Sequence, residues 1–299
     1  MEATYETLNL IKDGSILIVT INNTRSEVNL FRQQTAVELN ILITSLQNDT
    51  STKVVIFKSG NPKFFIAHFD VIPVPGKFLS PFCVQSHRNA NLKIPKGEPD
   101  PTAIDAAAFN GRVFQAMSNL PQPVIAMIDG PARGAGNEFL VACDMRFASK
   151  GARFSNFEGT LGLHPGSGGA AWMPLHIGRG RSMEFLLSGE DIDAETAERY
   201  GYVNKAFETS EEMHEYVMKL AKRIALFPLN GLASIKKTVT TLIQPSAELM
   251  ASEAVEWNRL LAEPEQAGLV GEFIKKSGNL TSVEFELHVP DEVAKLYGK

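Results

Sequence analysis

The stretch "PVIAMIDGPARGAGNEFLVACDMRFAS", residues 123–149, decides the fold. It opens with a short apolar run that predicts a strand over 124–129. A turn of small residues follows, and after it comes an apolar stretch that carries Glu138. A turn that opens a helix leaves amide N–H groups without helical acceptors, and the helix dipole there favours negative charge. The stretch therefore predicts bare amide donors close to a carboxyl group.

The pattern on either side of this stretch favours an α/β architecture. Apolar β-branched runs predict strands at 16–21, 53–59 and 144–149, with "KFFIA" at 63–67 extended, and a helix-periodic segment follows the first of them. We expect residues 1–205 to form the core, with a proline-rich insertion near 71–103 that we interpret as a cap on the substrate pocket. Residues 206–299 are almost wholly helical in pattern, and their apolar stripes must cover the core or a neighbouring subunit.

Composition narrows the class of protein. The chain has 299 residues, 44% of them hydrophobic and 21% charged, with a net charge of −5, which is ordinary for a globular protein and unsuited to nucleic acid as the main partner. We expect no membrane association and a cytoplasmic location, because neither a leader pattern nor a long apolar run is present. Cys83 and Cys143 are expected to be free thiols, with Cys143 a buried hydrophobe.

Several familiar motifs fail on single residues. "GAGNEF" has Phe139 where a dinucleotide-binding turn needs its third glycine, and no Gly-Lys-Ser/Thr follows as in a phosphate-binding loop. "HPGSGG" at 164–169 has Pro165 where a serine-nucleophile turn needs glycine. The six histidines show no metal-ligand spacing, so we expect no metal site.

Two turns and two acids remain as candidate chemistry. The turn at 130–136 and the turn "FFIAHFD" at 64–70 each offer an amide that can stabilise an oxyanion. Glu138 and Glu158 both lie in apolar or small-residue surroundings, where desolvation raises a carboxyl pKa into the range useful for proton transfer. A single glutamate beside glycines is more often a helix cap or an ion-pair partner, and the presence of two favours the catalytic interpretation.

At these residues the sequence resembles the crotonase family, the enoyl-CoA hydratase and isomerase superfamily. The resemblance runs from about residue 14 to about 240 and is strongest over 123–149, over "FEGTLGLHPGSGGAAWMPLHIG" and over "LLSGEDIDAETAERYGYVNKAF". It implies a crotonase-like spiral of ββα units, followed by a C-terminal helical oligomerisation region that builds trimers, often paired into hexamers.

The resemblance also implies roles for individual residues. The backbone amides of Phe69 and Ala135 correspond to the oxyanion donors, and Glu138 and Glu158 to the catalytic acids. The counterpart of Glu138 activates the water that adds at Cβ, and that of Glu158 supplies the proton to Cα. The implied substrate-binding positions are Ala67, His68, Asp70, Gly134 and Gly166. His68 and Phe69 depart from the small residues usual in the family, and the pair Lys236 and Lys237 could meet the phosphates of coenzyme A or form a solvated helix face.

The function implied is hydration of an α,β-unsaturated acyl-CoA by a hydro-lyase. The two alternatives are an enoyl-CoA isomerase that uses mainly Glu158 and a non-catalytic acyl-CoA-binding or oligomeric scaffold. No separate cofactor is expected, since coenzyme A enters as part of the substrate. The expected assembly is a homotrimer or a hexamer made of two trimers.

Overall fold

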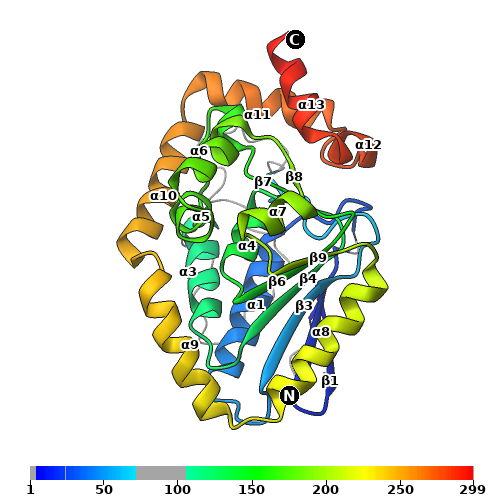
Figure 1. Cartoon of the computed structure of the whole chain (residues 1–299). Coiled ribbons are helices and arrows are strands. Elements are labelled where there is room, and N and C mark those ends of the chain that lie inside the picture. Colours follow the sequence, from blue (N-terminus) through cyan, green and yellow to red (C-terminus); the bar gives the residue numbers. More distant parts are fainter. Residues whose placement is uncertain (1–4, 24, 72–105, 299) are drawn as a thin grey trace.

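The computed structural model describes residues 5–23, 25–71 and 106–298. Its larger sheet has the strand order β1-β2-β3-β4-β6-β9 (Figure 1). The first two strands are antiparallel and the remaining pairs are parallel. The proline-rich insertion predicted at 71–103 lies outside the described residues apart from Val71. The six strands span Leu8–Asp13, Ile16–Ile21, Val54–Ser59, Val124–Ile128, Met145–Ser149 and Lys205–Phe207.

A second, smaller sheet carries the site. It has the order β5-β7-β8, with β5 at Pro131–Arg133, β7 at Arg153–Ser155 and β8 at Ile192–Asp193. The extended run predicted at 63–67 forms only an isolated bridge, between Ile66 and Ala132 of β5. This bridge places the two predicted turns, residues 64–70 and 130–136, side by side.

Helices cover both faces of the larger sheet. On one face α8 (Ser210–Ala225) packs Met213, Val217 and Ala221 against β2, β3, β4 and β6. The helix begins where the Thr209 side chain accepts a hydrogen bond from the amide of Glu212. The other face is covered by α1 (Gln33–Leu46), α3 (Ala106–Ser118) and α4 (Ala135–Val141). The strands between these layers are apolar on both sides, as parallel strands covered on both faces must be.

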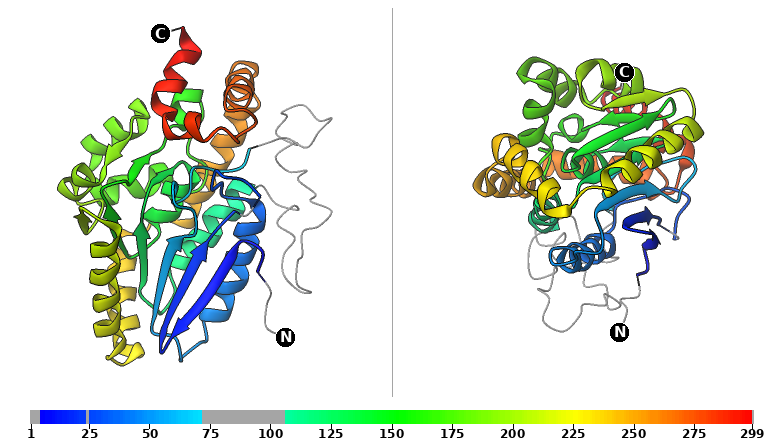
Figure 2. Two further views of the ribbon diagram at one scale, coloured as in Figure 1. Left: turned by 90° about the vertical axis from the view of Figure 1, so that its right-hand side faces the viewer. Right: turned by 60° about the horizontal axis from the view of Figure 1, so that its bottom comes forward.

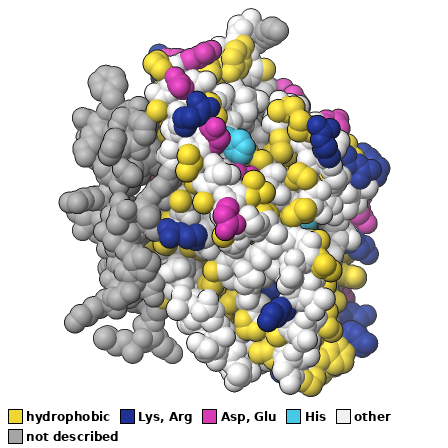
Figure 3. All heavy atoms as spheres, turned by 90° about the vertical axis from the view of Figure 1, so that its left-hand side faces the viewer, with side chains coloured by type: hydrophobic (Ala, Val, Ile, Leu, Met, Phe, Trp, Pro, Cys, Tyr) yellow, Lys and Arg dark blue, Asp and Glu magenta, His cyan; other side chains and the backbone are white. Residues whose placement is uncertain are grey.

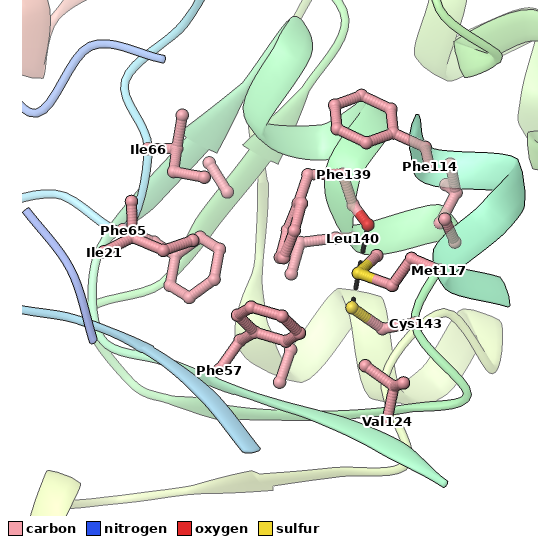
Figure 4. Packing of buried hydrophobic residues seen from close by; sticks show 14 of the residues in the cluster. Ile21, Phe57, Phe65, Ile66, Phe114, Met117, Val124, Phe139, Leu140 and Cys143 are labelled. Atoms are coloured by element: carbon pink, nitrogen blue, oxygen red, sulfur yellow. Dashed lines mark hydrogen bonds between the residues drawn. The ribbon is translucent and has the colours of Figure 1, made fainter. Parts of the chain in front are cut away.

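The apolar side of α4 anchors the glycine-rich stretch in the core. Figure 4 shows Phe139, Leu140 and Cys143 directed toward residues of β3 and α3, and the rings of Phe57 and Phe139 lie 5.1 Å apart, edge to face. Burial raises the pKa of the Cys143 thiol to about 12, so this cysteine is the buried hydrophobe that the sequence predicts. Because α4 is held on this side, Glu138 is fixed on the other.

From α8 onward the described residues form helices and the turns between them, as predicted for 206–299. Between β7 and β8 of the small sheet lie η1 (Glu158–Leu161), α5 and α6, and α7 then connects β8 to β9. Helix α10 then packs on α3 and α5, and the last helices lie beside α11 at one end of the molecule (Figure 2). No helix of the described residues is long and apolar enough to cross a membrane. The remaining bounds are Gly169–Ile177 (α5), Arg179–Ser188 (α6), Ala194–Tyr200 (α7), Leu229–Ile243 (α9), Ala247–Leu261 (α10), Pro264–Lys276 (α11), Val283–Leu287 (α12), Val289–Ala294 (α13) and Lys295–Tyr297 (η2).

Candidate active site

The two turns run in register. The amide of Phe65 donates to the carbonyl of Pro131 at 3.0 Å, and the amide of Arg133 donates to the carbonyl of Ile66 at 3.2 Å. Phe69 and Ala135 each lie three residues beyond the bridged pair Ile66 and Ala132. Two parallel segments therefore bring the two predicted donors to corresponding positions.

The first donor is set by pairing with Phe31. The amide of Phe31 donates to the carbonyl of His68 at 2.8 Å, and the amide of Asp70 donates to the carbonyl of Phe31 at 2.9 Å. In a parallel pair these bonds use the groups on either side of Phe69, so the N–H of Phe69 itself points away from Phe31. Among the bonds between described residues it has no acceptor. Phe69 lines the cavity described below.

The second donor opens α4. Ala135 is the first helical residue, so its N–H has no acceptor within the helix. The preceding Gly134 has φ 49° and ψ −122°, a conformation that residues with a Cβ rarely adopt. A Cβ on Gly134 would lie 2.9 Å from Oε1 of Glu158 and 3.6 Å from Cβ of His68. The glycine therefore leaves room for a carboxyl group immediately beside the donor.

Glu138 is buried and held by backbone amides. Its Oε1 accepts from the amide of Ser167 at 2.6 Å and from that of Gly169 at 3.2 Å. Burial, together with the charges of Glu158 and Glu253, raises the pKa of Glu138 well above its usual value, although the two amides oppose the rise. Its carboxyl group therefore holds a proton to higher pH than an exposed glutamate does.

Glu158 stands on the opposite side of Gly134. Burial raises its pKa to about 7, while the side-chain donor of Asn156 and the charge of His68 oppose the rise. Asn156 donates from Nδ2 to both carboxyl oxygens, at 3.3 and 3.1 Å. Its amide is oriented by Asn137, whose Nδ2 donates to Oδ1 of Asn156 at 2.6 Å and whose Oδ1 accepts from the hydroxyl of Tyr202. Because the charge of Glu158 raises the pKa of Glu138, the two acids titrate as a pair.

Most of the residues predicted for the site line one cavity of about 90 Å³. Ala67 is fully buried, bonds through its amide to the carbonyl of Asn29, and is not among the lining residues. The predicted positions that do line the cavity are His68, Phe69, Asp70, Gly134, Ala135, Glu138, Glu158 and Gly166.

The C-terminal helices supply site residues that the sequence analysis missed. Trp257 and Leu261 of α10 and Phe273 of α11 line the cavity. Glu253 of α10 accepts from the amide of Gly168 at 2.7 Å, and burial raises its pKa to about 7. The signal was in the sequence, since Glu253 occupies an apolar stripe at helical spacing with Trp257. This region thus completes the site of its own chain.

Lys236 has neither of the two predicted roles. Its Nζ lies 2.6 Å from Oδ2 of Asp144 and donates to the carbonyl of Gln122 at 2.9 Å, and the residue is 9% exposed. These contacts attach α9 to the core beside Asp144. Lys236 is therefore not available to coenzyme A phosphates or to solvent. Lys237 is exposed, as a solvated face requires.

Comparison with known proteins identifies the family. The family model for enoyl-CoA hydratase/isomerase matches residues 103–267, more than half of the chain. The chain belongs to this family. It is 31% identical over 219 residues to the short-chain-enoyl-CoA hydratase of Clostridium acetobutylicum, covering 72% of each chain. It is 28% identical over 220 residues to the crotonyl-CoA hydratase of Syntrophomonas wolfei, covering 74% of this chain and 76% of that one.

The fold agrees with solved structures. A candidate enoyl-CoA hydratase from Streptomyces avermitilis superposes with a TM-score of 0.84 at 32% identity, covering 98% of both chains. The mixed α/β core with its C-terminal helices is therefore the crotonase fold, as the resemblance implied.

Proposed function

We propose that the chain adds water reversibly across the α,β double bond of an enoyl-CoA thioester. One observation carries this proposal: two carboxyl groups with raised pKa values line the same cavity as two amides that have no acceptor among the described residues. The names of the enoyl-CoA and crotonyl-CoA hydratases to which the chain is similar support the substrate class.

The proposed reaction uses one proton shared by the two acids. The thioester oxygen accepts hydrogen bonds from the amides of Phe69 and Ala135, which stabilise the enolate. Glu138, as carboxylate, takes a proton from the water whose oxygen bonds to Cβ, and Glu158 gives its proton to Cα. The site then again holds one proton, now on Glu138, and a water hydrogen-bonded to both acids returns it to Glu158. The resting site favours the proton on Glu138, since the pKa of that acid is raised well above its usual value.

The test is the ultraviolet absorbance of crotonyl-CoA, which falls when the double bond is hydrated. Glu138→Gln and Glu158→Gln should each lower kcat by about 10²- to 10⁴-fold, the usual share of a general acid or base, with little change in KM. Glu248→Gln, an exposed acid on α10, is the matched control. Unchanged turnover in both site variants would refute the assignment.

Two other outcomes identify the alternatives. Double-bond migration that survives Glu138→Gln and is lost in Glu158→Gln would assign an isomerase instead. Tight binding of crotonyl-CoA with no spectral change in the unmodified protein would assign an acyl-CoA-binding scaffold. The expected cytoplasmic location stays a prediction.

We also propose that the chain assembles as a homotrimer or as two stacked trimers. Large apolar side chains are exposed on α9 and α10, including Ile235 at 67%, Leu242 at 78% and Val255 at 68%. Figure 3 views the side of the molecule where these helices lie and shows hydrophobic side chains spread among the charged ones. Exposed apolar area of this kind marks a protein interface. Analytical ultracentrifugation should give three or six times 32.7 kDa, and a monomer at micromolar concentration would contradict the proposal.

A further inference from the structure

A buried acid on the short helix α12 reaches the first oxyanion turn from 218 residues away. Glu286 is fully buried, and its Oε2 lies 3.0 Å from Nε2 of His68, the residue before the donor Phe69. The His68 ring packs edge to face against the stacked rings of Phe157 and Phe273, with its centre 5.7 Å from each. The contact is therefore made in the wall of the cavity, shielded from solvent.

The hydrogen bonds of His68 indicate its charge. Its Nδ1 lies 2.8 Å from the carbonyl oxygen of Phe69, which can only accept, so Nδ1 carries a hydrogen. Nε2 lies 3.0 Å from Oε2 of Glu286. An imidazolium donates from both nitrogens, so the two contacts favour the protonated form of the ring. Burial alone lowers the pKa of His68, and the neighbouring Glu286 carboxylate outweighs that effect and raises it.

The backbone of the same residue holds the second turn. Arg133, two residues before Ala135, is fully buried and donates from Nη1 to the carbonyl oxygen of Glu286 at 2.7 Å. It donates to the carbonyl of Leu287 at 3.3 Å, and its other bonds run to both oxygens of Asp191. The guanidinium thus caps the last carbonyls of α12 while its backbone lies in β5.

We propose that Glu286 is a positioning residue of the active site, whose carboxylate holds His68 and whose carbonyl holds Arg133, so that one residue sets the spacing of the two oxyanion donors. The proposal rests on the proposed function for the role of those donors. Displacement of reacting groups by about 1 Å costs about 10²-fold in rate. A residue that ties both turns to one helix guards against a displacement of that size.

The imidazolium has a second effect, on Glu158. The charged groups that face His68 are Glu286 from α12, Asp70 from its own segment and Glu158 from η1. Its positive charge lowers the pKa of Glu158, against the rise that burial causes. Neutralising His68 therefore moves the ionisation of Glu158 to higher pH.

The test compares Glu286→Gln with Glu284→Gln. Glu284 lies on the same helix with its side chain 86% exposed, so it is the matched control. Glu286→Gln keeps the shape and removes the charge. We expect kcat for crotonyl-CoA to fall by about 30-fold, while KM changes by less than about threefold. This fall is smaller than the fall of about 10²- to 10³-fold caused by removing an oxyanion donor, because both donors remain in place. The pH below which kcat/KM falls should move to a higher value. Glu284→Gln should match the unmodified protein in each respect.

Two further readouts keep the result decisive. The ¹⁵N signals of the His68 ring should report two protonated nitrogens at neutral pH in the unmodified protein and one in Glu286→Gln. The enolate absorbance of bound acetoacetyl-CoA, which needs the donors and no hydration, should fall in the same variant. If Glu286→Gln does not fold, Glu286→Asp should keep the imidazolium signals and a partial kcat.

The outcomes separate the two proposals. A protein that hydrates no enoyl-CoA refutes the proposed function, whereas the ring signals and the enolate band still decide the role of Glu286. Unchanged ring signals in Glu286→Gln, or an unchanged enolate band with unchanged kcat, overturn the positioning role.

Discussion

Replacing Gly134 by alanine tests the geometry between the second donor and Glu158. The added Cβ would lie 2.9 Å from Oε1 of Glu158, where ordinary contact begins at 3.4 Å. The carboxyl group must therefore retreat by about half an ångström. The backbone adds its own strain, because φ 49° and ψ −122° suit glycine alone.

The expected size of the effect follows from these two terms. Since a shift of about 1 Å costs about 10²-fold in rate, half of that shift should lower kcat about tenfold. Strain of about 1–3 kcal/mol should lower the melting temperature by roughly 2–10 °C in a chain of this size. KM should change little, because the thioester contacts remain.

The assay is crotonyl-CoA hydration together with thermal unfolding followed by circular dichroism. Gly151→Ala is the matched control, because a Cβ there meets nothing within 4 Å. In a Glu158→Asp background the shorter acid should relieve the contact, so the alanine should cost less stability than it does with Glu158 present. Wild-type kcat and melting temperature in Gly134→Ala would refute the reasoning.

Three more predictions follow from buried ionisable groups. The kcat/KM of hydration should fall about tenfold per pH unit below about pH 7. The reaction needs a pair of acids that holds one proton, and at lower pH Glu158, whose pKa is about 7, keeps a second one. A profile that stays flat down to about pH 5 would contradict this expectation. Lys236→Met should lower the free energy of unfolding by about 2 kcal/mol at about pH 8, since it removes the ion-pair partner of Asp144, whose side chain is only 21% exposed. The loss should shrink toward about pH 5, because burial already raises the pKa of Asp144 and a proton can then neutralise it, and an equal loss in urea melts at both pH values would argue against the ion pair. In a Cys83→Ser background the native protein should take up no iodoacetamide, because burial raises the pKa of Cys143 to about 12; labelling before unfolding would contradict that assignment.

The sequence predicted the elements that have a strong apolar pattern of their own. The strand at 16–21 is confirmed to the residue, because most of its apolar β-branched run is buried. The strand at Leu8–Asp13 was not anticipated, since it is exposed along much of its length at the edge of the sheet and shows no strong periodicity. Strands of two or three residues, such as β5 and β8, are too short for any pattern to reveal.

Some residues of the site could be predicted from the sequence and others could not. Glu138 and Glu158 were predicted, because each lies next to small residues in an apolar stretch, and the structure places both on one cavity. The contact of Glu286 with His68 could not be predicted, since it joins residues far apart and no spacing rule connects them. Lys236 was misjudged because helical periodicity alone cannot show that one lysine of an adjacent pair points at a half-buried aspartate.

The contact between α12 and the two turns bears on how the protein is made. A ribosome delivers residues 64–70 and 130–136 long before it delivers α12. The spiral core can begin to fold on the emerging chain, yet Arg133 then lacks its two carbonyl acceptors from α12 and His68 lacks the carboxylate that raises its pKa. If Glu286 has the proposed positioning role, the full rate is reached only after residue 286 has left the exit tunnel, and a stalled or proteolytically shortened product retains the acids and the donors without this support.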